Sequence, residues 1–227
     1  MQQTVYFNSN DKTFENSGDF LTPKRGTLEE IGNSVSHGLG TLFSVLALIL
    51  MLNLAETLNQ TVGAIIYFTG LFFSMTTSSL YHAFKHGSQV KRLFRRFDYV
   101  SIYLLIGATF APILLILIKG TLGFAFFTAQ WLVIAVGVTF IAVFGPNKFR
   151  PFHLAGYVIL GWSGLVFLPT MLDKSPLLFA FILGGGIIYS LGIIPFALKK
   201  RVAHFIWHLF VLAGAVTQWF GIFLTLY

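Results

Sequence analysis

Long apolar stretches alternate with short polar segments along this chain, and their spacing predicts seven helices that cross a membrane. A membrane-spanning helix needs about 20 mostly apolar residues, and each apolar stretch has about that length. The stretches lack the period-two alternation of a membrane β-strand. We therefore predict an all-α integral membrane protein, a seven-transmembrane helix bundle, with helices over residues 34–54, 61–82, 98–118, 121–144, 152–171, 176–197 and 204–225.

The polar N-terminal segment divides the chain into two regions. Residues 1–33 are expected to form a polar cytoplasmic tail and the lead-in to the first helix, and residues 34–227 the transmembrane domain. Residues 1–23 are rich in Asn, Thr and Ser, which favours a loosely ordered tail. Because no basic segment precedes an apolar one at the N-terminus, we expect no cleavable signal peptide.

The composition excludes a soluble protein and narrows the chemistry. Hydrophobic residues make up 56% of the chain and charged residues only 10%, against about 25% charged in an average globular domain. The chain has no cysteine, which rules out disulfides, thiolate metal sites and a cysteine nucleophile. Any metal must therefore be bound by histidine, aspartate or glutamate.

The basic residues are distributed unevenly between the two sides of the predicted bundle. All but Lys119 and Lys174 of the 15 lysines and arginines lie in the N-terminal tail or in the loops on the same side. By the positive-inside rule the N-terminus is cytoplasmic and the C-terminus external, in the plasma membrane if the protein is bacterial. The basic loops also suit contact with anionic lipid, so we expect no nucleic-acid partner.

Histidines and one aspartate gather at the predicted cytoplasmic ends of the helices. Odd-numbered helices begin on that side and even-numbered helices end there, so residues far apart in sequence share one depth. Asp98 opens the third predicted helix and is the only carboxylate at a predicted helix boundary on that side. Polar groups are costly in hydrocarbon, so this cluster is a candidate functional site. The six histidines are His37, His82, His86, His153, His204 and His208.

The spacing of the last two histidines indicates a metal site. His204 and His208 are four residues apart, which places both imidazoles on one helix face, about 6 Å apart along the axis. Such a pair suits two ligands of a tetrahedral zinc ion. His82 is the best third ligand, which leaves the fourth position open for water, and Ser78 lies one turn before it and faces the same way.

Each of these residues also has a purely structural interpretation. An H-x-x-x-H pair alone is a weak motif, because histidine at a membrane edge often hydrogen-bonds near headgroups. Asp98 could form an ion pair with the arginines that precede it, and Ser78 could bond a backbone carbonyl one turn back. We expect His86 and His153 in or beside solvated loops and leave both out of the site.

Three motifs together resemble the signatures of the hemolysin III and adiponectin-receptor (progestin and adipoQ receptor) family. The first is Glu30-Ile-Gly-Asn33-Ser-Val-Ser36-His37. The second is Ser78-Ser-Leu-Tyr-His82, followed by Asp98, and the third is His204-Phe-Ile-Trp-His208. The resemblance covers about residues 24–227, and the short tail resembles the bacterial hemolysin III branch more than the animal receptors.

This resemblance implies a seven-helix bundle with zinc near the cytoplasmic side. By analogy with the family, His82, His204 and His208 are the zinc ligands, Asp98 holds the zinc-bound water, and Ser78 lies beside the site. The resemblance extends to alkaline ceramidases, which hydrolyse an amide bond in a lipid. A fold and a metal do not by themselves establish turnover.

The first signature has two possible roles. Glu30, Asn33 and His37 are three and four residues apart, so they share one helix face. They could form a polar lock between helices at the cytoplasmic end, or they could hydrogen-bond the metal ligands and so orient them. The sequence favours the structural lock, and in either role the three side chains face inward.

The leading functional hypothesis is a zinc-dependent membrane hydrolase that acts on an amide, or less readily an ester, within a membrane lipid. Zinc-bound water is the expected nucleophile, with Asp98 as general base and Ser78 stabilising the oxyanion. A receptor or sensor with structural zinc, a hemolysin-like pore-forming protein and a transporter are alternatives. Three imidazoles also bind copper or nickel, so zinc is the expected but not the only compatible ion.

Overall fold

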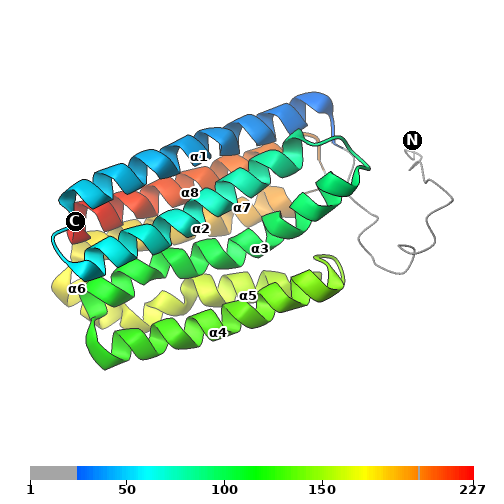
Figure 1. The fold of residues 1–227 in the computed structure, drawn as a ribbon. Coiled ribbons are helices and arrows are strands. Elements are labelled where there is room, and N and C mark those ends of the chain that lie inside the picture. The colour runs from blue at the N-terminus through cyan, green and yellow to red at the C-terminus, as the bar shows by residue number, and fades with distance from the viewer. Residues whose placement is uncertain (1–24, 199) are drawn as a thin grey trace.

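A computed structural model describes residues 25–198 and 200–227 as a bundle of long helices lying side by side (Figure 1). Within these residues, seven spans are long and apolar enough to cross a membrane, which confirms the predicted fold class. The predicted tail of residues 1–23 lies outside the described residues. The elements are α1 (Thr27–Leu54), α2 (Leu58–Ala83), α3 (Gln89–Pro112) with η2 (Ile113–Ile118), α4 (Gly120–Phe144), α5 (Arg150–Trp162) with η3 (Ser163–Phe167) and α6 (Leu168–Lys174), α7 (Pro176–Ala197) and α8 (Ala203–Leu226).

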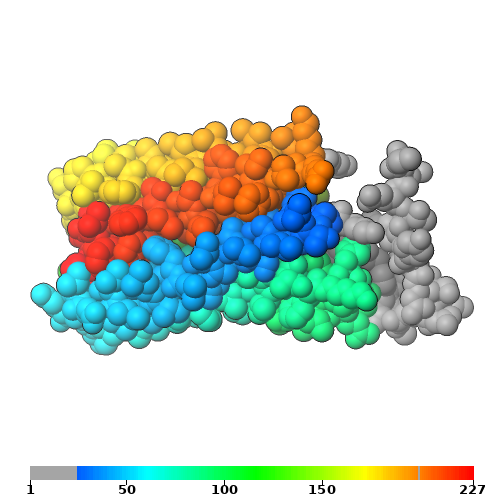
Figure 2. All heavy atoms as spheres, turned by 90° about the horizontal axis from the view of Figure 1, so that it is seen from above, coloured from blue at the N-terminus to red at the C-terminus, as the bar shows by residue number. Residues whose placement is uncertain are grey.

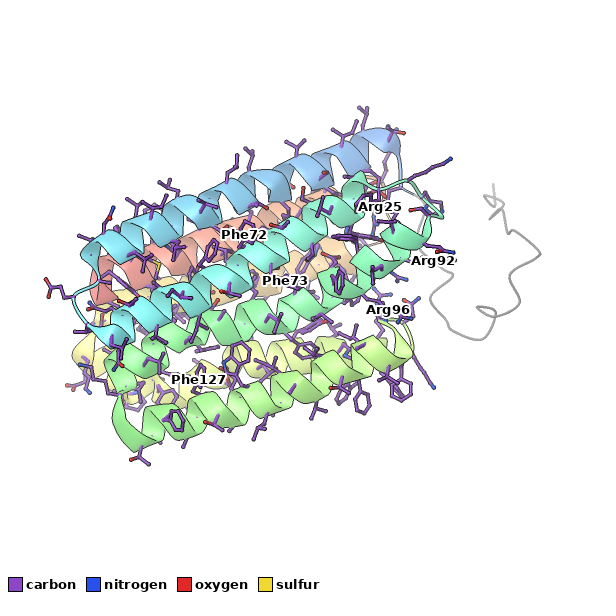
Figure 3. All side chains as sticks on the ribbon, in the orientation of Figure 1. Arg25, Phe72, Phe73, Arg92, Arg96 and Phe127 are labelled. Atoms are coloured by element: carbon purple, nitrogen blue, oxygen red, sulfur yellow. The ribbon has the colours of Figure 1, made fainter. Side chains whose placement is uncertain are left out.

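The helices that carry the histidine motifs pack against one another. Helix α8 runs between α1 and α7 along one face of the bundle (Figure 2), and α1 packs against α2. Helix α3 packs against α2, and the α4–α5 hairpin lies on the other side of α3 (Figure 1). One end of the bundle, where α1, α3, α5 and α8 begin, carries the basic loops and is called the basic end below. Arg25, Arg92 and Arg96 lie there (Figure 3).

Two helices begin earlier than their apolar stretches predict. Helix α1 begins at Thr27 and α3 at Gln89. Polar residues at the basic end are helical too, so each helix extends beyond the residues that are apolar enough for the hydrocarbon core of a membrane. The Oγ of Ser88 caps α3 by accepting a hydrogen bond from the backbone N–H of Lys91 at 3.1 Å. Asp98 therefore lies well inside α3, in its third turn, rather than at its first residue.

Proline interrupts two of the spans. Pro112 ends the α-helical part of the third span, which continues as the π-helical segment η2. In the fifth span the 3₁₀ segment η3 precedes Pro169, which has no N–H to donate to an earlier carbonyl and stands in the first turn of α6. The fifth span is therefore two short α-helices joined by a tighter turn.

Small residues bring α2 and α3 close together, while large apolar side chains cover the outside. A Cβ added to Gly70 of α2 would stand 2.3 Å from the Cβ of Ala108 on α3, so only glycine permits this approach. On the outer surface Leu42, Leu132 and Ile159 are each more than 60% exposed. An exposed apolar surface of this kind is stable in lipid and not in water, as expected for a multi-pass membrane protein.

Candidate metal centre

Three histidines from two helices meet at the basic end of the bundle. His82 lies in the last turn of α2, and His204 and His208 lie in the first two turns of α8. One ring nitrogen from each lies within 4.8 Å of the others. The side chains of His82 and His208 are buried. The three residues, which the sequence predicted to lie at one depth, thus form one cluster.

The distances within the cluster suit a bound metal ion. The Nε2 atoms of His204 and His208 are 3.2 Å apart, and ligand nitrogens of a tetrahedral zinc ion with bonds of about 2.0–2.1 Å would be about 3.3 Å apart. The Nε2 of His82 is buried and has no hydrogen-bond partner among the described residues. A buried imidazole nitrogen without a partner is costly unless it binds something. The cluster could therefore hold a metal ion.

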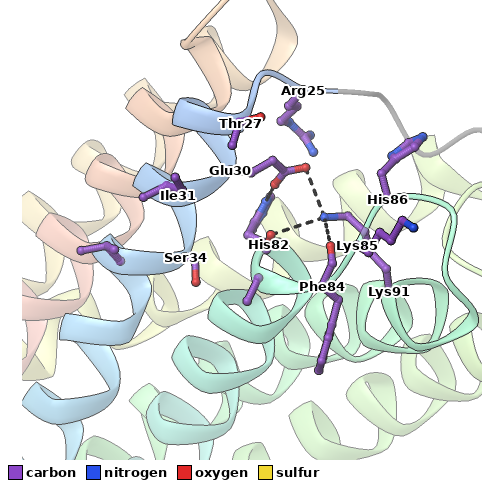
Figure 4. Close-up of a pocket in the computed structure, with 12 residues that line it drawn as sticks. Arg25, Thr27, Glu30, Ile31, Ser34, His82, Phe84, Lys85, His86 and Lys91 are labelled. Atoms are coloured by element: carbon purple, nitrogen blue, oxygen red, sulfur yellow. Dashed lines mark hydrogen bonds and ion pairs between the residues drawn. The ribbon is translucent and has the colours of Figure 1, made fainter.

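Residues of α1 contact the Nδ1 atom of His82, and a residue of α3 lies near its backbone carbonyl (Figure 4). Its Nδ1 forms a short hydrogen bond with a carboxylate oxygen of Glu30, and the amide of Asn33 lies 3.2 Å from the same nitrogen. Because a carboxylate only accepts hydrogen bonds, Nδ1 carries the proton and Nε2 keeps its lone pair. This is the tautomer that a histidine ligating through Nε2 requires.

A buried lysine completes this support. The Nζ of Lys91 donates to Glu30 at 3.2 Å and to the carbonyl oxygen of Phe84 at 3.1 Å, and lies 3.5 Å from that of His82 (Figure 4). Only 2% of the Lys91 side chain and 16% of the Glu30 side chain are exposed. Lys91 thus joins the start of α3 to the end of α2 and fixes the carboxylate that orients His82. A pocket of about 470 Å³ opens beside this group.

His37 makes a different contact from the other residues of the first motif. Its Nε2 lies 3.3 Å from the backbone carbonyl oxygen of His208, and the two rings are 3.9 Å apart. His37 therefore fastens α1 to α8, as the predicted polar lock would. Glu30 and Asn33 instead contact His82 directly. This agrees with the other role considered for the motif, which is to orient a metal ligand.

Asp98 and Ser78 lie beside the cluster, on α3 and α2. Ser78 and His82 both lie near enough to the Asp98 carboxylate to interact with it electrostatically. The backbone carbonyl of Asp98 accepts a hydrogen bond from Ser101 at 2.7 Å. Both side chains border the same cavity as His204 and His208. A carboxylate in this position can accept a proton from a group bound at the cluster.

The cavity runs from the basic end into the interior of the bundle and measures about 1040 Å³. Its mouth carries arginine and lysine side chains, and its deeper walls are mostly apolar and aromatic. His204, His208 and Asp98 lie between these two parts. Residues of the deeper walls are Leu105, Phe110, Ile182, Tyr189, Trp207 and Val211.

The structure corrects one expectation and adds residues that the sequence did not indicate. His153 was expected in or beside a loop but is a buried residue of α5, 3.1 Å from the hydroxyl of Tyr103 and on the cavity wall. His86 is exposed in the loop after α2, as expected. Lys91 and Arg95 are buried beside the site, although a run of basic residues gave no sign that these two differ from their neighbours.

Comparison with known proteins identifies relatives that match most of this chain. The family model for haemolysin-III related proteins matches residues 26–219. A protein named Hemolysin-3 from Bacillus cereus is 34% identical over 197 residues, covering 85% of this chain and 89% of that protein. The Hemolysin-3 homolog of Bacillus subtilis (strain 168) is 32% identical, covering 85% and 92%. The human monocyte to macrophage differentiation factor is 27% identical, covering 88% and 85%.

Proposed function

The chain belongs to the haemolysin III-related family, and we propose that it is a zinc-dependent hydrolase that cleaves an amide bond within a membrane lipid. The observation that carries this proposal is the position of the three-histidine cluster. Two of its members, His204 and His208, border with Asp98 a cavity that is charged at its mouth and apolar inside. An amphiphilic molecule bound there would place its polar–apolar junction beside the histidines.

Zinc suits the donor set, since the cluster offers three imidazoles and the chain has no thiolate. When bound, such an ion polarises a substrate carbonyl and makes water a stronger acid. Glu30, which is itself held by Lys91, keeps His82 in the tautomer and orientation that binding through Nε2 needs. The protein residues thus prepare the site, and the ion supplies the Lewis acidity.

Asp98 and Ser78 are the proposed reacting partners from the protein. Asp98 would accept a proton from the attacking water and deliver it to the departing amine nitrogen. Its carboxylate lies near enough to Ser78 and His82 to interact with both. The single O–H of Ser78 can donate to the oxygen that becomes negative during attack on the carbonyl, once Asp98 has taken up the proton and no longer needs this donor. An ester would undergo the same attack but would not need protonation of an amine.

The basic end of the bundle is proposed to face the cytoplasm. It carries the arginines and lysines of the loops after α2, α4 and α7, which the positive-inside rule places on that side. Lys119 and Lys174 lie at the opposite end. The bacterial relatives support a plasma-membrane location for this multi-pass protein. The site would then act on lipid from the cytoplasmic leaflet.

The name Hemolysin-3 of the bacterial relatives suggests a pore-forming protein, but the shape of the cavity does not favour a pore. Its described lining reaches from the basic end to Thr109 and Gln218, and includes no residue of the loops at the opposite end. A transmembrane pore needs a polar path through both halves of the membrane. The cavity instead has the form of a binding chamber with one charged mouth.

Metal content and hydrolysis test the proposal together. The detergent-purified chain should contain about one zinc ion per molecule and release fatty acid from a lipid amide, with both lost after chelation. His82→Ala should lose the metal while remaining folded, and His86→Ala, which changes an exposed histidine outside the cluster, should retain it. A folded wild type without metal would overturn the proposal. Loss of folding with the metal in His82→Ala would instead favour a structural ion in a receptor.

A further inference from the structure

Two arginines at the mouth of the cavity have buried nitrogens without acceptors. The Nη1 of Arg25, just before α1, and the Nη1 of Arg95, on α3, have no hydrogen-bond partner among the described residues. Both side chains line the cavity that contains Asp98 and His204. Only 5% of Arg95 is exposed. Two guanidinium groups that line one cavity therefore each carry a nitrogen without a partner among the described residues.

Such groups are rarely left unpaired in folded proteins. More than 90% of buried polar groups have a partner, and an unpaired charged donor is especially costly. The acidic side chains that line the same cavity are Glu29 and Asp98. Asp98 interacts electrostatically with both arginines, but the ion pairs within 4 Å among the described residues are those of Glu30 and do not include Asp98. The missing acceptor is therefore best supplied by a ligand that carries anionic oxygens, for which guanidinium is well suited.

Arg95 is held in place to bind such a group. Its Nη2 donates to the side-chain oxygen of Asn147 at 2.6 Å, and its guanidinium lies 5.7 Å from the centre of the Tyr99 ring. These contacts fix the guanidinium and leave Nη1 without a protein acceptor among the described residues. The cations Arg150, Lys200 and Arg201 also line the mouth, so the local charge favours an anion.

The position of Arg95 limits where the anion sits relative to the reacting bond. Arg95 precedes Asp98 by three residues on α3, so both lie on one helix face, about 4.5 Å apart along the axis. Arg95 is on the side of the basic end, and the apolar walls lie in the other direction. An anion bound to Arg95 would therefore be only a few bonds from a carbonyl held beside Asp98.

We propose that the ligand of this cavity is an anionic lipid amide, whose carboxylate or phosphate lies a few bonds from the amide nitrogen and is bound by Arg25 and Arg95. The acyl chain occupies the apolar part of the cavity. This inference rests on the proposed function for the position of the amide. An N-acyl amino acid has the required arrangement, with its carboxylate close to the amide nitrogen.

A matched pair of lipids tests the assignment. N-oleoylglycine and N-oleoylethanolamine share the acyl chain and the amide, and differ in having a carboxylate or a neutral hydroxyl. Binding to the full, metal-loaded chain in detergent is followed by the fluorescence of Trp162 and Trp207, which line the cavity. Wild type should bind the anionic lipid about ten- to a hundredfold more tightly, the range expected for hydrogen bonds to a charged group.

Variants then identify the residues responsible. Arg95→Gln should lose most of this preference, and Arg25→Gln, near the surface, provides a second test if Arg95→Gln does not fold. Arg96→Gln is the control, because Arg96 lies outside the cavity and donates to the carbonyl oxygen of Ala142. Equal loss of preference in the Arg95 and Arg96 variants would overturn the proposal, because general surface charge would then explain the preference.

Two further outcomes separate this inference from its alternatives. If inorganic phosphate or N-acetylglycine displaces the lipid at similar concentration, the site binds a soluble anion and the lipid assignment is wrong. Released oleate is measured in the same samples. Selective binding without release would reject the proposed hydrolase and keep this inference, whereas hydrolysis of both lipids with equal efficiency and affinity would reject the inference and keep the hydrolase.

Discussion

Replacing Glu30 by glutamine tests whether the residues behind His82 control metal binding. The carboxylate of Glu30 accepts hydrogen bonds from His82 and Lys91. Glutamine has nearly the same shape but no charge, and its amide can turn either an oxygen or a donor NH₂ toward His82. The variant therefore removes the charge that fixes the His82 tautomer while disturbing packing little.

The structure indicates two separate effects of this change. Loss of a group that orients a metal ligand lowers metal affinity by about 10- to 100-fold. Lys91 is also left as a buried cation without its carboxylate. Removing one partner of a buried ion pair destabilises a fold by about 3–5 kcal/mol. We expect about 3 kcal/mol here, because Glu30 keeps some access to water. Changing Lys91 to methionine as well should remove the second effect but not the first.

The double variant therefore separates folding from metal binding. Thermal unfolding in detergent with a chelator measures the stability of the metal-free proteins, and competition with a zinc-sensitive dye measures affinity. We expect Glu30→Gln to lose both stability and affinity, and Glu30→Gln with Lys91→Met to regain stability only. Wild-type zinc affinity in Glu30→Gln would refute the reasoning, as would recovery of affinity in the double variant.

Three further predictions concern Asp98, the topology and the start of α8. Asp98→Asn should retain the metal and lose hydrolysis, measured by metal analysis and fatty-acid release; equal loss of both would indicate a folding role. A reporter fused after Tyr227 should be external if the basic end is cytoplasmic, and a cytoplasmic signal would contradict that orientation. Val202 adopts a positive φ of 59°, which costs a β-branched residue about 1–2 kcal/mol. Val202→Gly should therefore raise the apparent Tm by about 2–8 °C, and an unchanged or lower Tm would show that this strain is absent.

The helices were predictable because the thickness of a membrane fixes the length of each apolar stretch. Their starts were less predictable, since the polar turns before residue 34 and before Asp98 are helical without being apolar. The convergence of His82, His204 and His208 also followed from the alternating direction of the helices. Their roles as ligands, and that of Asp98 as a base, stay predictions.

The side-chain partners of these residues could not be predicted, because they depend on how the helices pack. A sequence of several basic residues gives no sign that Lys91 reaches back to Glu30 while Arg92 does not line the pocket beside it. Likewise, the cavity exists only because α3, α5, α7 and α8 surround it in three dimensions. The burial of His153 has the same origin, since a residue near a helix start gains its neighbours from other helices.

The division of the histidine cluster between α2 and α8 has a consequence for biosynthesis. Glu30, His82 and Lys91 all come from the first three helices, so their network can form while the later helices are still being synthesised. His204 and His208 arrive with the last helix, after α3 to α7 have entered the membrane. A nascent chain arrested before α8 would hold a single oriented imidazole, and metal acquisition would be the final step of maturation.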